Sequence, residues 1–126
     1  MNGLVGVWKL IEVRAFDETG QAVPSPFGPQ PMGVAIFDAE RVMAMGGDGR
    51  MALSPQTKRA FVAYGGKYSF DGAKLVTRVD GASSPDLLED QVRHIRFDSP
   101  RRMTAIPVSR LFGRSGGVEL VWERVD

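Results

Sequence analysis

The sequence predicts an all-β protein, in which eight antiparallel strands form an up-and-down barrel with one short helix. Turn-forming residues recur about every ten positions, which is the spacing typical of β-sandwiches and barrels. Short runs of alternating apolar and polar residues lie between these turns. All connections but one are short, and a meander of eight strands removes its exposed edges only by closing on itself. Residues 1–126 are assigned to a single domain.

The strands are expected at residues 6–16, 33–38, 41–46, 67–70, 74–80, 91–97, 102–108 and 118–125. Asp71-Gly72 is the strongest hairpin signal among the turns between them. The glycine-rich residues 46–50 lack the Gly-Lys-Ser/Thr ending of a phosphate-binding loop, so we expect a tight turn there. The helix is expected between Ser54, a capping residue followed by proline, and Gly65-Gly66, which would end it.

Composition and charge exclude several classes of function. Sixteen basic and fifteen acidic residues leave a net charge of +1, which gives no basic surface for nucleic acid or a membrane. The absence of cysteine excludes disulfides, thiolate nucleophiles and zinc–cysteine sites. No apolar run approaches the ~20 residues of a membrane span, and the first residues do not resemble a signal peptide. We therefore expect a cytoplasmic protein without metal or cofactor. Twelve arginines against four lysines hint at a bacterial source.

Period-two alternation predicts which side chains point into the barrel. The aromatic residues at 68, 70, 97 and 122 fall on apolar faces, yet two strands add charged residues to the same faces as their large aromatics. A buried charge is costly unless it is paired or contacts a polar ligand. The predicted ligand-binding residues are Trp8, Glu12, Arg14, Phe27, Tyr68, Phe70, Arg93, Phe97 and Trp122.

The three charged residues of this set, Glu12, Arg14 and Arg93, allow two interpretations. They either pair across the barrel interior or lie solvated at an open barrel end. The faces of the first strand could also be reversed, because its other face is apolar too. An apolar outer face would then meet a covering segment or a partner subunit, so a homodimer is possible.

Residues 24–31 lie in the longest connection without predicted structure, between the strands that end at 16 and begin at 33. They contain four prolines around Phe27, and long loops of this kind are often functional. The segment is either a lid across the barrel mouth or a stiff connector that packs Phe27 for stability. His94, the sole histidine, faces away from Ile95 and Phe97, which does not favour a catalytic triad.

Five segments resemble the lipocalin-like domain family of bacteria and fungi. They are residues 4–10 (LVGVWKL, with a G-x-W signature), residues 26–33 with their prolines and glycines, 66–68 (GKY), 90–93 (DQVR) and 120–124 (LVWER). The resemblance implies an eight-stranded barrel with a short helix and a central pocket, in which Trp8 plugs the closed end. It implies no catalytic residue. Secreted lipocalins usually carry a signal peptide and a disulfide, so this sequence does not favour an exported carrier.

Three functions follow from these observations. The leading hypothesis is the binding of a small, mostly apolar molecule with one polar or acidic group, whose polarity Arg14 or Arg93 would fix. The alternative is an isomerase, cyclase or hydratase, with Glu12 as general acid or base and Arg93 and Tyr68 stabilising charge. The third is an interaction module that uses the outer face of the first strand.

Overall fold

The protein is a closed antiparallel barrel of eight long strands, described by a computed structural model over residues 2–108 and 117–126. The sheet order is β2-β1-β3-β4-β5-β6-β7-β8-β9, and β1 also pairs with β9, which closes the barrel. The strands are β1 (Gly6–Phe16), β2 (Ala22–Val23), β3 (Pro31–Phe37), β4 (Arg41–Asp48), β5 (Phe61–Phe70), β6 (Lys74–Ala82), β7 (Gln91–Ser99), β8 (Arg102–Pro107) and β9 (Val118–Arg124).

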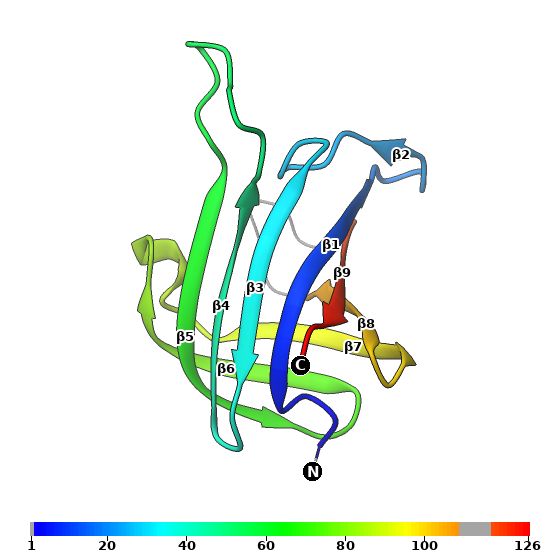
Figure 1. Ribbon diagram of the computed structural model, residues 1–126, viewed down its shortest axis with the longest axis vertical. Coiled ribbons are helices and arrows are strands. Elements are labelled where there is room, and N and C mark those ends of the chain that lie inside the picture. Colours follow the sequence, from blue (N-terminus) through cyan, green and yellow to red (C-terminus); the bar gives the residue numbers. More distant parts are fainter. Residues whose placement is uncertain (1, 109–116) are drawn as a thin grey trace.

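The predicted barrel is confirmed, but the helix predicted before Gly65 is wrong. Phe61–Phe70 is one continuous strand, and the described part of the chain contains only one short 3-10 helix, η1 (Pro85–Leu87). Ser54 and Pro55 instead belong to the long connection between β4 and β5, which projects beyond the barrel (Figure 1). The capping signals were real local features, but pairing of β5 with both neighbouring strands overrides them. No helix in the described residues is long and apolar enough to cross a membrane.

The glycine-rich run that starts at Gly46 is also strand rather than turn, because residues 46–48 complete β4. Gly46 lies opposite Gly33 of β3, and a Cβ at Gly46 would come 3.1 Å from the Phe27 ring. A Cβ at Gly47 would come 2.5 Å from the Ala60 carbonyl oxygen. The glycines therefore allow a side chain and a neighbouring backbone to approach β4 closely.

Strand β1 contains a β-bulge that changes which residues face inward. Leu10 pairs with Trp122, but the next partner, Val121, pairs with Glu12, so Ile11 is the extra residue. Before the bulge Trp8 and Leu10 point inward and are fully buried. One extra residue reverses the alternation, so that Val13 and Ala15 pack toward the core after it.

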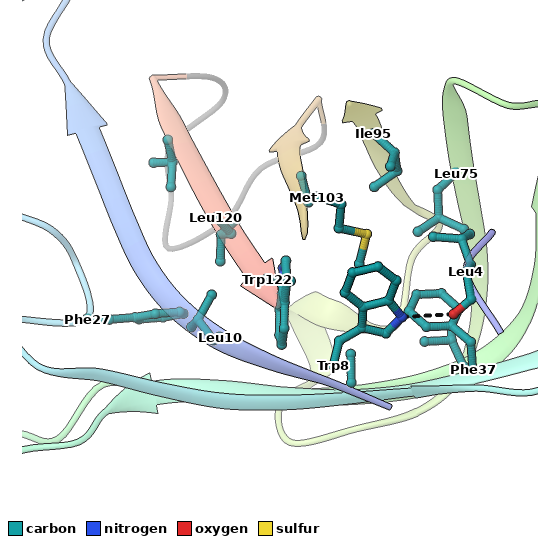
Figure 2. Packing of buried hydrophobic residues seen from close by; sticks show 14 residues of the cluster. Leu4, Trp8, Leu10, Phe27, Phe37, Leu75, Ile95, Met103, Leu120 and Trp122 are labelled. Carbon is teal, nitrogen blue, oxygen red and sulfur yellow. Dashed lines mark hydrogen bonds between the residues drawn. The ribbon is translucent and has the colours of Figure 1, made fainter. Parts of the chain in front are cut away.

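The two ends of the barrel differ. The N-terminal segment and the short β3–β4, β5–β6 and β7–β8 turns lie at one end, which we call the floor. The other end, the mouth, carries β2 and the β4–β5 connection (Figure 1). Buried apolar side chains fill the space between, with Phe27 at one end of the cluster, Leu4 and Phe37 at the other, and Trp8 beside these two (Figure 2).

Candidate functional site: a cavity in the barrel

The barrel interior contains a cavity of about 60 Å³. A buried water molecule needs roughly 10–15 Å³ of such space, so the cavity has room for about four to six waters. Its wall is almost entirely apolar, with polar groups from three neighbouring strands. The lining residues are Phe27, Ala35, Phe37, Val42, Ala44, Met45, Gly46, Val62, Tyr64, Leu75, Thr77, Arg93, Ile95, Met103, Ala105, Leu120 and Trp122.

Trp8 seals the floor below this cavity, as the family resemblance implies. Its indole Nε1–H donates to the Leu4 carbonyl oxygen at 2.8 Å, and the side chain is fully buried (Figure 2). The Arg124 guanidinium stacks on the Trp8 ring, 4.4 Å from its centroid. Arg124 also donates to the Val5 and Gly3 carbonyl oxygens, each at 2.7 Å. These contacts fix the N-terminal segment across the floor.

Phe27 lies at the mouth and is only 1% exposed. The segment around it packs closely against β4: Gly28 has φ +74°, and a Cβ there would come 2.8 Å from the Asp48 carboxylate. Asp48 is itself buried and forms an ion pair with Arg50. Hydrogen bonding by the Arg50 side chain lowers the pKa of Asp48 to about 2. The segment therefore packs Phe27 in the core, as a stiff connector would, and a role of residues 24–31 as a lid stays a prediction.

The polar part of the cavity wall consists of Tyr64, Thr77 and Arg93, on β5, β6 and β7. Arg93 is 6% exposed, and its guanidinium lies 5.8 Å from the centroid of the Tyr64 ring. It donates to the Val92 carbonyl oxygen at 3.1 Å and to the Gln91 amide oxygen at 3.4 Å. Gln91 is in turn held by the carbonyl oxygens at 87 and 89. These contacts hold the guanidinium against β7 and beside the Tyr64 ring.

Three of the predicted site residues, Phe27, Arg93 and Trp122, line the cavity. Trp8 lies beneath it. The remaining aromatics belong to the floor: Tyr68 donates its hydroxyl to the Asp38 carbonyl oxygen at 2.7 Å and accepts from Asn2 at 3.0 Å. Phe70 and Phe97 make an edge-to-face pair with centroids 6.2 Å apart, and Phe97 is 37% exposed.

The inward placement of Glu12 and Arg14 is wrong. Their side chains are 52% and 40% exposed, and they pair with each other at 2.9 Å on the outer face of β1. Arg14 also pairs with Glu119 of β9 at 3.0 Å, and hydrogen bonds to the two glutamates raise its pKa. The bulge at Ile11 is the reason, because strict alternation from Trp8 carries both charges to the inner face. The polar spot of three charges predicted inside the barrel is therefore reduced to Arg93.

Sequence reasoning missed Thr77 as a site residue, and it placed Tyr64, a possible donor to a ligand, on the predicted helix instead of on a strand. The helix expected before Gly65 hid Tyr64, although continuing the alternation of Tyr68 and Phe70 backward through β5 places it inward. Thr77 lies on the same face of β6 as Leu75. Because threonine is polar, however, it does not mark this position as inward-facing in the sequence.

Outside the cavity, the described residues show little that could support catalysis. His94 is exposed on β7, as expected from its alternation with Ile95. No group of three or more histidines or carboxylates that could hold a metal ion occurs among residues 2–108 and 117–126.

The outer wall carries exposed apolar side chains, although on β3 and β4 more than on the first strand. Ile36 is 52% exposed and Met43 67%, whereas Ile11 of β1 is 37% exposed. A groove of about 640 Å³ runs beside Met43, with Gly65 and Gly81 among its lining residues. Association through the outer surface stays a prediction, as does a homodimer.

Comparison with known proteins agrees with this architecture. The sequence pattern described as the lipocalin-like domain matches residues 5–125. No curated protein matches the sequence significantly. Among solved structures, a redesigned β-barrel is similar in fold, with a TM-score of 0.50 and 14% sequence identity over 98% of this chain and 93% of that chain. The chain therefore belongs to the lipocalin-like domain family.

Proposed function

We propose that the protein binds a small, mostly apolar molecule in the barrel cavity. The observation that carries the proposal is a largely apolar cavity inside the barrel, with a few polar groups gathered on one side. Binding sites for small molecules typically combine these two features. The sealed floor supports it as well, because the Trp8–Arg124 contacts leave the Phe27 end as the opening.

The cavity size restricts the ligand. Pockets for drug-sized molecules have volumes of roughly 300–1,000 Å³, well above the 60 Å³ found here. We therefore infer a ligand about as large as one aromatic ring or a short alkyl chain. For so small a molecule we expect a dissociation constant in roughly the micromolar to millimolar range.

No observation favours the isomerase, cyclase or hydratase alternative. It needs a general acid or base in the cavity, and Glu12 lies on the outer wall. The cavity-lining residues among those described include no carboxylate and no histidine.

A cavity-filling substitution tests the proposal. We expect toluene and indole to bind the wild-type protein, measured by calorimetry and by ligand-observed NMR. Ala105→Leu places additional methyl groups in the cavity and should abolish binding, at a cost in stability of about 1–3 kcal/mol. Ala63→Leu makes the same change beside the outer groove and is the matched control. Unchanged binding by Ala105→Leu would show that the cavity is not the site.

A further inference from the structure

We propose that two copies of this chain associate through the outer face of β3, β4 and β5, with Met43 of each copy seated in the groove of the other. The groove is the one of about 640 Å³ that runs beside Met43. This inference concerns the outer wall of the barrel, so it is independent of the ligand proposed for the cavity.

Exposed apolar side chains gather on this face. The three strands are neighbours in the sheet and lie side by side on one flank of the barrel (Figure 1). Surface apolar residues are usually scattered singly, whereas a contiguous patch marks an interaction site. Five of the eleven large apolar side chains that are exposed in the described residues belong to these strands: Met32, Val34, Ile36, Met43 and Phe61.

The face has a ridge beside a groove. Ile36 and Met43 lie opposite each other on β3 and β4, and they form the ridge because they are 52% and 67% exposed. Gly65 and Gly81 lie opposite each other on β5 and β6 and line the groove. Met43 is paired with Gly65, so the ridge and the groove are adjacent. A two-fold axis along the strands between β4 and β5 lays the ridge of each copy in the groove of the other, as a symmetric dimer interface requires.

Gly81 indicates that the groove has an occupant. Its φ lies outside the left-handed region, and no described atom lies within 4 Å of a Cβ built there. Gly66 differs, because a Cβ there would collide with the Arg78 carbonyl oxygen. The described part of the chain therefore needs glycine at 66 but not at 81. Glycine inside a strand often marks close approach by another group, and the flexible Met43 side chain of a second copy is suited to fill the space.

The face is large enough for a dimer. Its five exposed apolar side chains present roughly 450 Å² of surface, a size typical of functional patches. Homodimer interfaces are about 65% apolar, so this area corresponds to roughly 700 Å² per partner, close to the standard size of about 800 Å². Beside the groove, Arg41 and Asp80 form an ion pair at 2.6 Å. Their charges neutralise each other, so this rim does not repel a second copy.

Sedimentation equilibrium of the full chain tests the proposal. We expect the wild type to reach twice the mass of one chain, with a dissociation constant roughly in the micromolar range. Met43→Lys places a charge at the centre of the interface and should weaken association by at least about 30-fold, the effect typical of a central residue. Gly81→Leu fills the groove and should also weaken association, while the open space above Gly81 lets the barrel fold. Met51→Lys makes the same change at a methionine that is 98% exposed on the β4–β5 connection, and it should leave the dimer intact.

Disulfide cross-linking tests the position of the ridge without relying on a loss of association. The chain contains no cysteine, so only introduced thiols report. A mixture of Met43→Cys chains and Gly81→Cys chains should form a covalent dimer on oxidation, because a disulfide needs Cα atoms roughly 4.4–6.8 Å apart. A mixture of Met51→Cys chains and Gly81→Cys chains should not.

Three results would overturn the inference. The first is a wild-type protein that stays monomeric at about 1 mM. The second is a dimer that Met43→Lys weakens no more than Met51→Lys, in variants whose circular dichroism matches the wild type. The third is cross-linking between positions 51 and 81 in place of 43 and 81, which would put the β4–β5 connection of the second copy in the groove. Toluene binding in the cavity tests the proposed function separately, because the outer face does not line that cavity.

Discussion

Single residues at the floor explain the G-x-W motif in physical terms. Gly6 has φ +137°, a conformation that side chains rarely adopt, and a Cβ there would collide with the Arg124 guanidinium. Trp8, two residues on, provides the ring on which that guanidinium stacks. Gly6 therefore leaves room for the Arg124 side chain and Trp8 stacks on it, although Arg124 lies 116–118 positions later in the chain.

Three glycine substitutions separate these effects. Gly81 has open space around its Cβ position, and Gly81→Ala should be nearly neutral. Gly20 has φ +87° and also open space, so Gly20→Ala should cost about 1 kcal/mol from backbone strain alone. Gly6→Ala adds the collision with Arg124 and should cost about 2–4 kcal/mol. Urea unfolding measures all three. A Gly6→Ala variant no less stable than Gly20→Ala would contradict the packing described for the floor.

Asp48 gives the mouth a defined response to acid. Because Arg50 lowers the folded-state pKa to about 2, below the ~3.9 of an unfolded aspartate, the ionised carboxylate stabilises the folded protein. This contribution is complete above about pH 4 and is lost as the pH falls toward 2. Asp48→Asn should therefore be less stable than wild type at pH 7, with a difference that shrinks between pH 4 and pH 2.

Urea midpoints at several pH values check this response. Asp86→Asn, which changes an exposed aspartate of η1, is the control. A stability difference between Asp48→Asn and wild type that stays constant from pH 7 to pH 2 would show that the Asp48–Arg50 pair does not respond to acid as described.

At the scale of elements, the bulge in β1 determines which residues of this strand face the core and which face solvent. Strict alternation from Trp8 sends Glu12 inward and Val13 outward, whereas the extra residue Ile11 does the reverse. The consequence extends to β9, because Arg14 reaches Glu119 only on the outer wall.

A pair of substitutions on either side of the wall tests the bulge. Val13→Asp would place a charge against the core and should cost about 3 kcal/mol. Glu12→Val loses a surface ion pair and should cost less than about 1 kcal/mol. Thermal and urea unfolding report both values. The opposite order of stability would mean that β1 has no bulge and that Glu12 faces inward.

The strands could be predicted from sequence because turn residues and alternation are local signals, and eight strands leave closure as the economical way to remove edges. The prediction of a helix before Gly65 was wrong because the capping signals at Ser54 are also local, whereas β5 forms by pairing with the neighbouring strands β4 and β6. The predicted inward orientation of Glu12 was wrong for a related reason, since a bulge can be recognised only when the partner strand is known. The inward orientation of Arg93 was predicted correctly because burial alternates strictly along residues 91–95, the first part of β7.

At the scale of the whole molecule, the two barrel ends have different tasks. The floor is fixed by side chains that bind backbone, such as Trp8 to Leu4 and Arg124 to Gly3. At the mouth lies a buried aromatic ring, Phe27, on a segment whose Gln30 carbonyl oxygen accepts a hydrogen bond from the Gly49 amide just after β4. Polar contacts to the backbone thus hold the floor together, whereas apolar packing holds the mouth together.

Shortening the ring at the mouth should change ligand size. Phe27→Ala should cost about 3–5 kcal/mol and let naphthalene, too large for the wild-type cavity, bind. Phe27→Leu is a milder variant for the case in which the alanine variant unfolds. Phe61→Ala, an exposed phenylalanine of β5, is the control and should leave ligand size unchanged. Calorimetry with toluene and naphthalene distinguishes these outcomes, and exclusion of naphthalene by both Phe27 variants would show that Phe27 does not limit the cavity.

The hydrogen bond from Arg124 to Val5 joins residues 119 positions apart. Strand β2 pairs with β1 only at Ala15 and Phe16, so most of the edge of β1 that β9 covers has no partner before β9 exists. During synthesis on the ribosome, β1 therefore emerges about a hundred residues before the strand that completes it. Hairpins from β3 to β8 can form in order as they appear, whereas the floor must assemble last. Contacts so distant in the sequence slow folding, so a nascent chain of this protein exposes an unpaired edge until its final strand is released.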